Sequence, residues 1–142
     1  MLDKEFTKRK VKLIQEELVH LEDFADLSFD DIAKDLTKLA AMERFLERII
    51  TRAIDINQHI LAEKGRGAEG VRRYEETFTD LAGLGVYSEE FAKAIAPSAG
   101  LRNRLVHEYD NVDEKIVYNS VGDALSQYAQ YCDFILKYIE KN

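Results

Sequence analysis

The chain has 142 residues, 46% of them hydrophobic and 33% charged, which is the balance of a soluble globular protein. At this length we expect a single domain over residues 1–142, and no apolar run approaches the ~20 residues that a membrane-spanning helix needs. The formal net charge of −7 argues against a protein that coats nucleic acid non-specifically, but it leaves room for a local basic cleft.

The amino-terminal half predicts two long helices. Residues Met1 to Lys12 are charged and no apolar segment follows them, so we expect no secretory signal and a cytoplasmic protein. Apolar residues at steps of three and four predict a helix over about Asp3–Leu27, and Ser28 begins a break. A second helix is predicted over about Asp31–Glu63, where it would be roughly 50 Å long.

The carboxy-terminal half predicts three more helices. A short helix over about Tyr74–Leu81 follows a glycine-rich connector, which lacks the Gly-Lys-Ser/Thr ending of a phosphate-binding loop. Ser88 is a good N-cap for the next helix, which Pro97 should break or kink before it resumes over Leu101–Tyr109. The last helix is expected over about Asp113–Ile139.

Strand patterns are nearly absent, and one proline and seven glycines leave little to interrupt helices. The chain therefore predicts an all-α fold, an antiparallel bundle of four main helices plus one short helix. The single cysteine, Cys132, lies in an apolar helical pattern and is expected to be a small buried hydrophobe without a disulfide. No Cys/His cluster and no pair of acids has the spacing of a metal site, so neither a metal nor a cofactor is expected.

The segment from Arg102 to Tyr109 gathers groups that bind phosphate and move protons at neutral pH. His107, with an ordinary pKa near ~6.5, is able to act as a general acid or base. Arg102 offers a rigid fork of charged donors to phosphoryl oxygens, and Asn103, four positions before His107, shares its helix face. These residues predict a metal-free site for RNA cleavage. A second copy of the chain would supply the second histidine that the two proton transfers require.

Structural alternatives to this interpretation stay open. A lone helical histidine is more often structural or simply exposed than catalytic. Tyr109 is either an aromatic anchor at the helix end or a phenol near the site that stacks on a base or is modified.

The motif Arg102-x4-His107-x-Tyr109 resembles the signature of HEPN-domain proteins, specifically the HepT toxins of prokaryotic toxin–antitoxin pairs. Asn103 directly after the arginine and Asp110 directly after the tyrosine add to the resemblance. So does the position of the motif, which lies late in a small chain that is predicted to be all-α.

The resemblance implies an all-α, HEPN-like homodimer whose motifs meet in a cleft between the subunits. It implies a metal-independent ribonuclease that arrests growth, with Arg102 and His107 catalytic and Asn103 positioning the substrate. It also implies a partner, a small nucleotidyltransferase antitoxin that transfers AMP from ATP to Tyr109 and inhibits the toxin. The assembly that it implies is either the homodimer or a larger toxin–antitoxin hetero-oligomer.

Other arginines are candidate contacts for RNA or for the antitoxin. Arg44, Arg48 and Arg52 are spaced by four and form a positive stripe about 12 Å long on the second helix. The alternative is a solvated face that is paired with Glu43 and Glu47. A further candidate contact is Arg104, whose role the motif leaves open.

A second hypothesis comes from a different functional class. The same bundle would serve as a non-catalytic helical adaptor that binds a nucleotidyltransferase, with the arginine and histidine strip as its docking patch. An adaptor would be tolerated when it is overexpressed without its partner, whereas a toxin would not.

Overall fold

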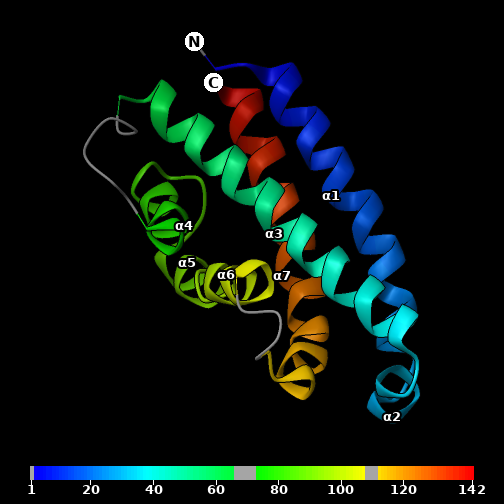
Figure 1. Ribbon diagram of the computed structural model, residues 1–142. Coiled ribbons are helices and arrows are strands. Elements are labelled where there is room, and N and C mark those ends of the chain that lie inside the picture. The colour runs from blue at the N-terminus through cyan, green and yellow to red at the C-terminus, as the bar shows by residue number, and fades with distance from the viewer. Residues whose placement is uncertain (1, 66–72, 108–111) are drawn as a thin grey trace.

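The computed structural model describes residues 2–65, 73–107 and 112–142, and all the regular structure within them is helical (Figure 1). The predicted all-α fold class is confirmed. No helix among these residues is long and apolar enough to cross a membrane. The described helices are α1 (Lys4–Ala25), α2 (Phe29–Ala33), α3 (Leu36–Glu63), α4 (Tyr74–Gly83), α5 (Glu89–Ile95), α6 (Ser98–His107) and α7 (Glu114–Lys141).

The helix predicted over Asp31–Glu63 is divided into α2 and α3. Asp35 has an extended backbone conformation, and its carboxylate accepts hydrogen bonds from the backbone N–H groups of Thr37 and Lys38. Such a side chain satisfies amide groups that the first turn of a helix leaves unpaired, so Asp35 begins a new helix. The 28 residues of α3 then span about 42 Å rather than 50 Å.

The break expected at Pro97 is present, and it separates α5 from α6. The second helix begins at Ser98 rather than Leu101. The Ser98 hydroxyl donates to the carbonyl of Ile95 at 2.7 Å and lies 2.6 Å from the hydroxyl of Tyr128 on α7. The corner between α5 and α6 is thereby tied to α7. Two of the four predicted main helices are thus each split in two, which leaves three long and four short helices among the described residues.

The long helices α1, α3 and α7 pack together, and α1 runs antiparallel to the other two (Figure 1). The chain returns from the end of α3 to the start of α7 through α4, α5 and α6; α4 and α6 pack beside α3, and α5 packs against α4. One continuous set of buried side chains links these helices, including Leu46, Ile50 and Tyr131. Cys132 is fully buried in this core, as predicted.

Candidate active site

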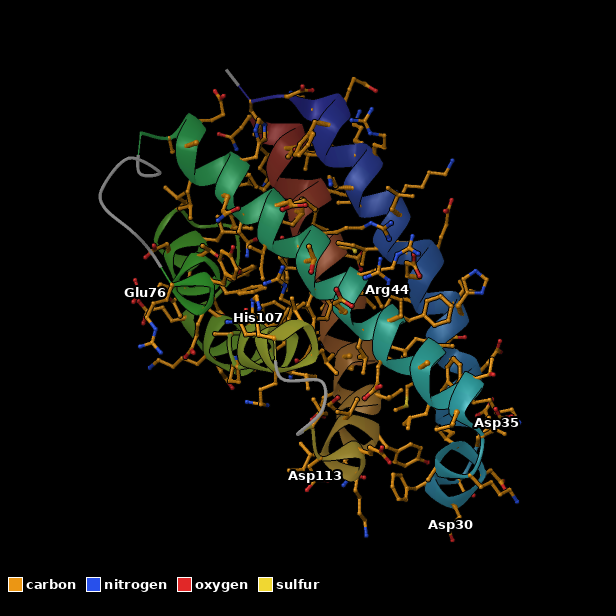
Figure 2. The ribbon with its side chains drawn as sticks, in the orientation of Figure 1. Asp30, Asp35, Arg44, Glu76, His107 and Asp113 are labelled. Carbon is orange, nitrogen blue, oxygen red and sulfur yellow. The ribbon has the colours of Figure 1, made fainter. Side chains whose placement is uncertain are left out.

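Helix α6 carries the motif residues Arg102, Asn103 and His107. Leu101 and Leu105, four residues apart, are only 7% and 8% exposed. They turn one face of α6 into the core, because side chains at this spacing lie on the same side of a helix. Arg102 and Asn103 are half-buried beside that face, while Arg104 and His107 are exposed. His107 is the last residue of α6 and lies where the helix ends (Figure 2).

Arg102 is held by contacts from three helices. Its Nε donates to the Thr51 Oγ1 on α3 at 3.0 Å, and its Nη1 donates to the Asn103 Oδ1 at 3.1 Å. Its guanidinium carbon lies 5.3 Å from the ring centroid of Tyr74 at the start of α4, within the range of a cation–π contact. These contacts fix the guanidinium before any ligand arrives. Thr51 and Tyr74 were not predicted, because neither belongs to the motif nor lies near it in sequence.

The structure brings Asn103 to Arg102, not to His107. Among the described residues, no hydrogen bond or ion pair joins His107 to Arg102 or Asn103. Five positions on an ideal helix separate Arg102 from His107 by about 140°, which accounts for their pointing to different sides of α6. The exposed imidazole is therefore free to meet a substrate or a second copy of the chain. Tyr109 lies outside the described residues.

The arginine stripe on α3 is paired with acids, and its main partner comes from another helix. Arg48 and Arg52 both contact the same carboxylate oxygen of Glu17 on α1, each at 2.9 Å. Glu17 is 7% exposed, and its second oxygen is buried without a hydrogen-bond partner. Arg44 pairs with Glu47 at 3.0 Å, as the alternative interpretation of this stripe predicted.

Glu43, the other acid suggested as a partner for the stripe, has no ion pair among the described residues. Burial raises the pKa of the Glu43 carboxyl, and the nearby carboxylate of Glu114 raises it further. The stripe therefore depends on Glu17, which the pattern of α3 alone does not reveal.

The stripe borders an open hollow of about 420 Å³ beside the motif arginine. Thr51 lines this hollow and also accepts the hydrogen bond from Arg102, so the two features adjoin each other. The lining combines four cations with two acids, and its charge is therefore positive but partly neutralised. Its residues are Lys10, Arg44, Glu47, Arg48, Thr51, Arg52 and Asp55.

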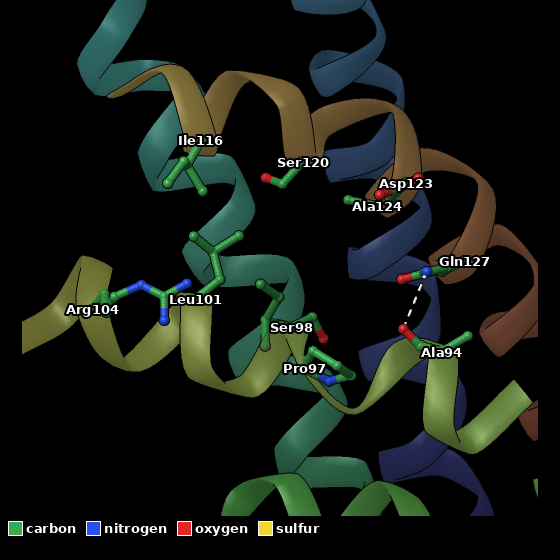
Figure 3. Close-up of a pocket in the computed structure, with 11 residues that line it drawn as sticks. Ala94, Pro97, Ser98, Leu101, Arg104, Ile116, Ser120, Asp123, Ala124 and Gln127 are labelled. Carbon is green, nitrogen blue, oxygen red and sulfur yellow. Dashed lines mark hydrogen bonds between the residues drawn. The ribbon is translucent and has the colours of Figure 1, made fainter. Parts of the chain in front are cut away.

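A second cavity, of about 190 Å³, lies between α6 and α7 (Figure 3). Arg104 and Leu101 approach it from α6, and Ser120 and Asp123 approach it from α7. Sequence reasoning did not find this cavity, because it depends on how far apart two helices lie.

Residues 2–65, 73–107 and 112–142 contain no group of three or more His, Cys, Asp or Glu side chains placed to hold a metal ion. On α6 the described part of the motif offers the guanidinium of Arg102, the amide of Asn103 and the imidazole of His107. This set suits binding of an anion and transfer of protons.

Comparison with known proteins gives the family. The family model described as "Ribonuclease HepT-like" matches residues 14–135. A protein from Aphanizomenon flos-aquae named "tRNA nuclease HepT" is 40% identical over 130 residues, which cover 92% of this chain and 87% of that protein. A putative RNase from Archaeoglobus fulgidus is 32% identical over 97 residues, which are 64% of this chain and 69% of that protein.

The fold is also found in solved structures. A tri-AMPylated HEPN toxin from Shewanella oneidensis, in complex with an MNT antitoxin, has a TM-score of 0.80 and 22% identity. The superposition covers 95% of this chain and 99% of that one. This similarity confirms the predicted HEPN-like fold, and the family match confirms the predicted enzyme class. The chain belongs to the family of HepT-like ribonucleases.

Proposed function

We propose that this HepT-like ribonuclease is the toxin of a toxin–antitoxin pair and cleaves RNA in the cytoplasm without a metal ion. Arg102 and His107 are the catalytic residues. The observation that carries the proposal is the fixed guanidinium of Arg102, half-buried on α6, one helical turn and a half from an exposed histidine. The relative named as a tRNA nuclease makes tRNA the substrate class to test first.

The proposed cleavage uses the 2′-hydroxyl of the RNA itself. One imidazole takes the proton of the 2′-OH, and the oxygen attacks the adjacent phosphorus. The P–O5′ bond breaks, and a protonated imidazole gives its proton to the leaving 5′-oxygen. Arg102 neutralises the charge that develops on the phosphoryl oxygens. The products are a 2′,3′-cyclic phosphate and a free 5′-hydroxyl.

We propose a homodimer, because one histidine does not readily serve both proton transfers. The orientation of the two catalytic groups supports this assembly: His107 points away from Arg102 within one chain. In a dimer with the two α6 helices facing each other, His107 of a second copy would come near Arg102. Asn103, which accepts a hydrogen bond from Arg102, would position the guanidinium and the sugar.

Adenylylation of Tyr109 by a nucleotidyltransferase antitoxin is the proposed off-switch. The tri-AMPylated HEPN toxin of similar fold supports this, as does the tyrosine two positions after the histidine. AMP would add negative charge and bulk beside the motif, so it would repel RNA phosphates and occupy Arg102. The antitoxin would bind the toxin in a hetero-oligomer.

The arginines of α3 have a secondary role in this proposal. Arg44 is 62% exposed and Arg48 is 42% exposed, so both keep donors available beside the hollow next to Arg102. Arg52 is largely buried against Glu17 and serves the fold more than a ligand. We propose that Arg44 and Arg48 contact RNA phosphates or an acidic surface on the antitoxin, and that Arg104 also contacts the RNA.

Growth of a bacterial host tests this function. Induction of the wild-type chain without an antitoxin is expected to stop growth, and Arg102→Ala and His107→Ala are expected to restore it. His20→Ala is the matched control, because His20 stacks on Phe45 away from the motif and should leave toxicity intact. Full toxicity of either motif variant would contradict the mechanism. Growth unaffected by the wild-type chain would instead favour the non-catalytic adaptor.

A further inference from the structure

The cavity between α6 and α7 has an apolar floor made by three helices. Ile50 of α3 is fully buried beneath it, and Leu101 and Ala124 are each 7% exposed on its two sides. At one end of the cavity α7 is tied to α5, where Gln127 donates from its Nε2 to the carbonyl of Ala94 at 3.2 Å (Figure 3). The space left between the helices is about 190 Å³. This is less than the roughly 300–1,000 Å³ of a pocket that encloses a whole drug-sized ligand, so the cavity suits one flat ring system.

The rim of the cavity carries one cationic donor and one anionic acceptor. Arg104 is exposed on α6, and its Nη1 would lie 3.7 Å from a Cβ at Gly100, so the guanidinium folds back along the helix towards the cavity. Asp123 is exposed on α7 at the same cavity. Within the part of the chain that the structure describes, neither charge has a hydrogen bond or an ion pair, so both remain available to a ligand.

We infer that this cavity is a nucleobase pocket and that its preferred base is guanine. The face of the base would pack on the apolar floor, and the two charges on the rim would hydrogen-bond to the edges of the base. Arginine pairs bidentately with the O6 and N7 acceptors of guanine, which is a common specific contact to that base. A carboxylate accepts hydrogen bonds, and guanine presents two neighbouring donors, N1–H and N2–H. Adenine, cytosine and uracil do not offer both arrangements together.

The pocket lies next to the proposed catalytic histidine. Arg104 and His107 are three positions apart on α6, and side chains at this spacing are neighbours on the helix surface. A base held by Arg104 would therefore belong to a nucleotide that flanks the scissile phosphate. This inference rests on the proposed ribonuclease function and adds sequence selectivity to it: the enzyme cuts next to a guanine.

Two variants separate the pocket from the catalytic machinery. Asp123→Asn removes the anionic acceptor, and its matched control is Asp133→Asn, an exposed aspartate on the same helix that does not line the cavity. Ser120→Leu fills the cavity; the Ser120 hydroxyl bonds only to the carbonyl of Val117 on its own helix, so the substitution breaks no contact between helices. Thermal unfolding of both variants checks that the fold is retained.

The first experiment maps cleavage sites in a random-sequence RNA pool with the full-length protein. We expect the wild-type chain and Asp133→Asn to prefer guanine at one flanking position by tenfold or more, and Asp123→Asn and Ser120→Leu to lose most of that preference. No base preference in the wild-type chain, or the same preference in all four proteins, would overturn the inference. A loss of dimer in Ser120→Leu with the preference intact would also overturn it, because the cavity would then be a contact between copies.

The second experiment measures binding of the four nucleoside monophosphates by NMR titration, which needs no cleavage. We expect GMP to bind at least fivefold more tightly than AMP, CMP or UMP, and Asp123→Asn to remove the difference. Selective GMP binding without RNA cleavage would support the guanine pocket and refute the proposed ribonuclease mechanism. RNA cleavage without selective GMP binding would support the ribonuclease mechanism and refute the guanine pocket.

Discussion

The Nε of Arg102 donates a hydrogen bond to the Oγ1 of Thr51 over 3.0 Å, and this contact joins α6 to α3 across 51 positions of sequence. It turns a flexible side chain into a fixed one, and it places the motif arginine at the edge of the hollow that Thr51 lines. Tyr74 and Asn103 complete the surroundings of the guanidinium. A site that is organised before the substrate arrives loses less conformational freedom on binding.

Thr51→Val should lower the activity more than the stability. Valine keeps the shape of threonine but accepts no hydrogen bond, so Arg102 loses one restraint worth about 1 kcal/mol. We expect kcat/KM for RNA cleavage to fall roughly fivefold. Thr79→Val is the control, because the Thr79 hydroxyl bonds only to the carbonyl of Glu76 on its own helix. Equal activity of Thr51→Val and the wild-type enzyme would show that the contact does not position Arg102.

Glu17→Ala should destabilise the fold. Arg52 would be left largely buried, with 15% of its side chain exposed and no acid in contact. Removing one partner of a buried ion pair costs about 3–5 kcal/mol of unfolding free energy. Because Arg48 is partly exposed, we expect a loss near the lower value, about 3 kcal/mol. Glu47→Ala removes the pair with the exposed Arg44 and should cost about 0.5 kcal/mol. Urea unfolding measures both, and similar losses for the two variants would contradict the account.

Cys132 should be unreactive in the folded protein. Burial raises the pKa of its thiol to about 12, and the carboxylate of Asp133 adds to the shift. The thiolate is the reactive form, so at pH 8 the native protein should resist iodoacetamide, whereas the protein in urea should be modified within minutes. Modification of the native protein at the rate seen in urea would show that the thiol is accessible.

The free energy of unfolding should fall at alkaline pH, because the fold buries the Cys132 thiol in its protonated form. The Cys132 thiol stays protonated in the fold but ionises near ~8.5 when the chain is unfolded. The stability that the protonated thiol contributes is fully present below pH ~8.5 and is lost as the pH rises towards 12. Burial also raises the pKa values of Tyr87, Tyr128 and Tyr131, which act in the same direction above pH ~10. Urea unfolding at pH 8 and pH 10.5 should show the decrease, and Cys132→Ala should make it smaller.

Tyr109→Phe should abolish modification by the antitoxin. Co-expression with the proposed nucleotidyltransferase antitoxin is expected to add one or more AMP groups to the wild-type chain, as read from intact mass. Tyr138→Phe is the control, because Tyr138 lies near the carboxy-terminal end of α7, away from the motif on α6. AMP on Tyr109→Phe would place the modification elsewhere. An unmodified wild-type chain would favour inhibition by simple binding.

The sequence predicted the helical class, the break at Pro97 and the motif helix, because these follow from local patterns of apolar, capping and helix-breaking residues. It missed the helix start at Asp35, although the aspartate is a good N-cap, since the apolar stripe continues across it. The family was also predictable, because its motif is contiguous and unbroken in this chain, and the comparisons confirm it.

The supporting contacts were not predictable, because each joins residues that are far apart in the chain. Glu17 reaches Arg52 over 35 positions and Thr51 reaches Arg102 over 51, and no local spacing indicates either pair. The stripe of α3 was correctly recognised as a row of arginines, but the acid that holds two of them lies on α1. The cavity between α6 and α7 likewise depends on the packing of three helices.

The most direct test of the central claim is RNA cleavage by the purified protein in excess EDTA, with analysis of the product ends. The wild-type enzyme and His20→Ala should cut tRNA to fragments that carry a 2′,3′-cyclic phosphate and a 5′-hydroxyl, while Arg102→Ala and His107→Ala should lose at least a hundredfold in rate. Cleavage that EDTA abolishes, 5′-phosphate ends, or unchanged rates in the two motif variants would contradict metal-free catalysis by Arg102 and His107.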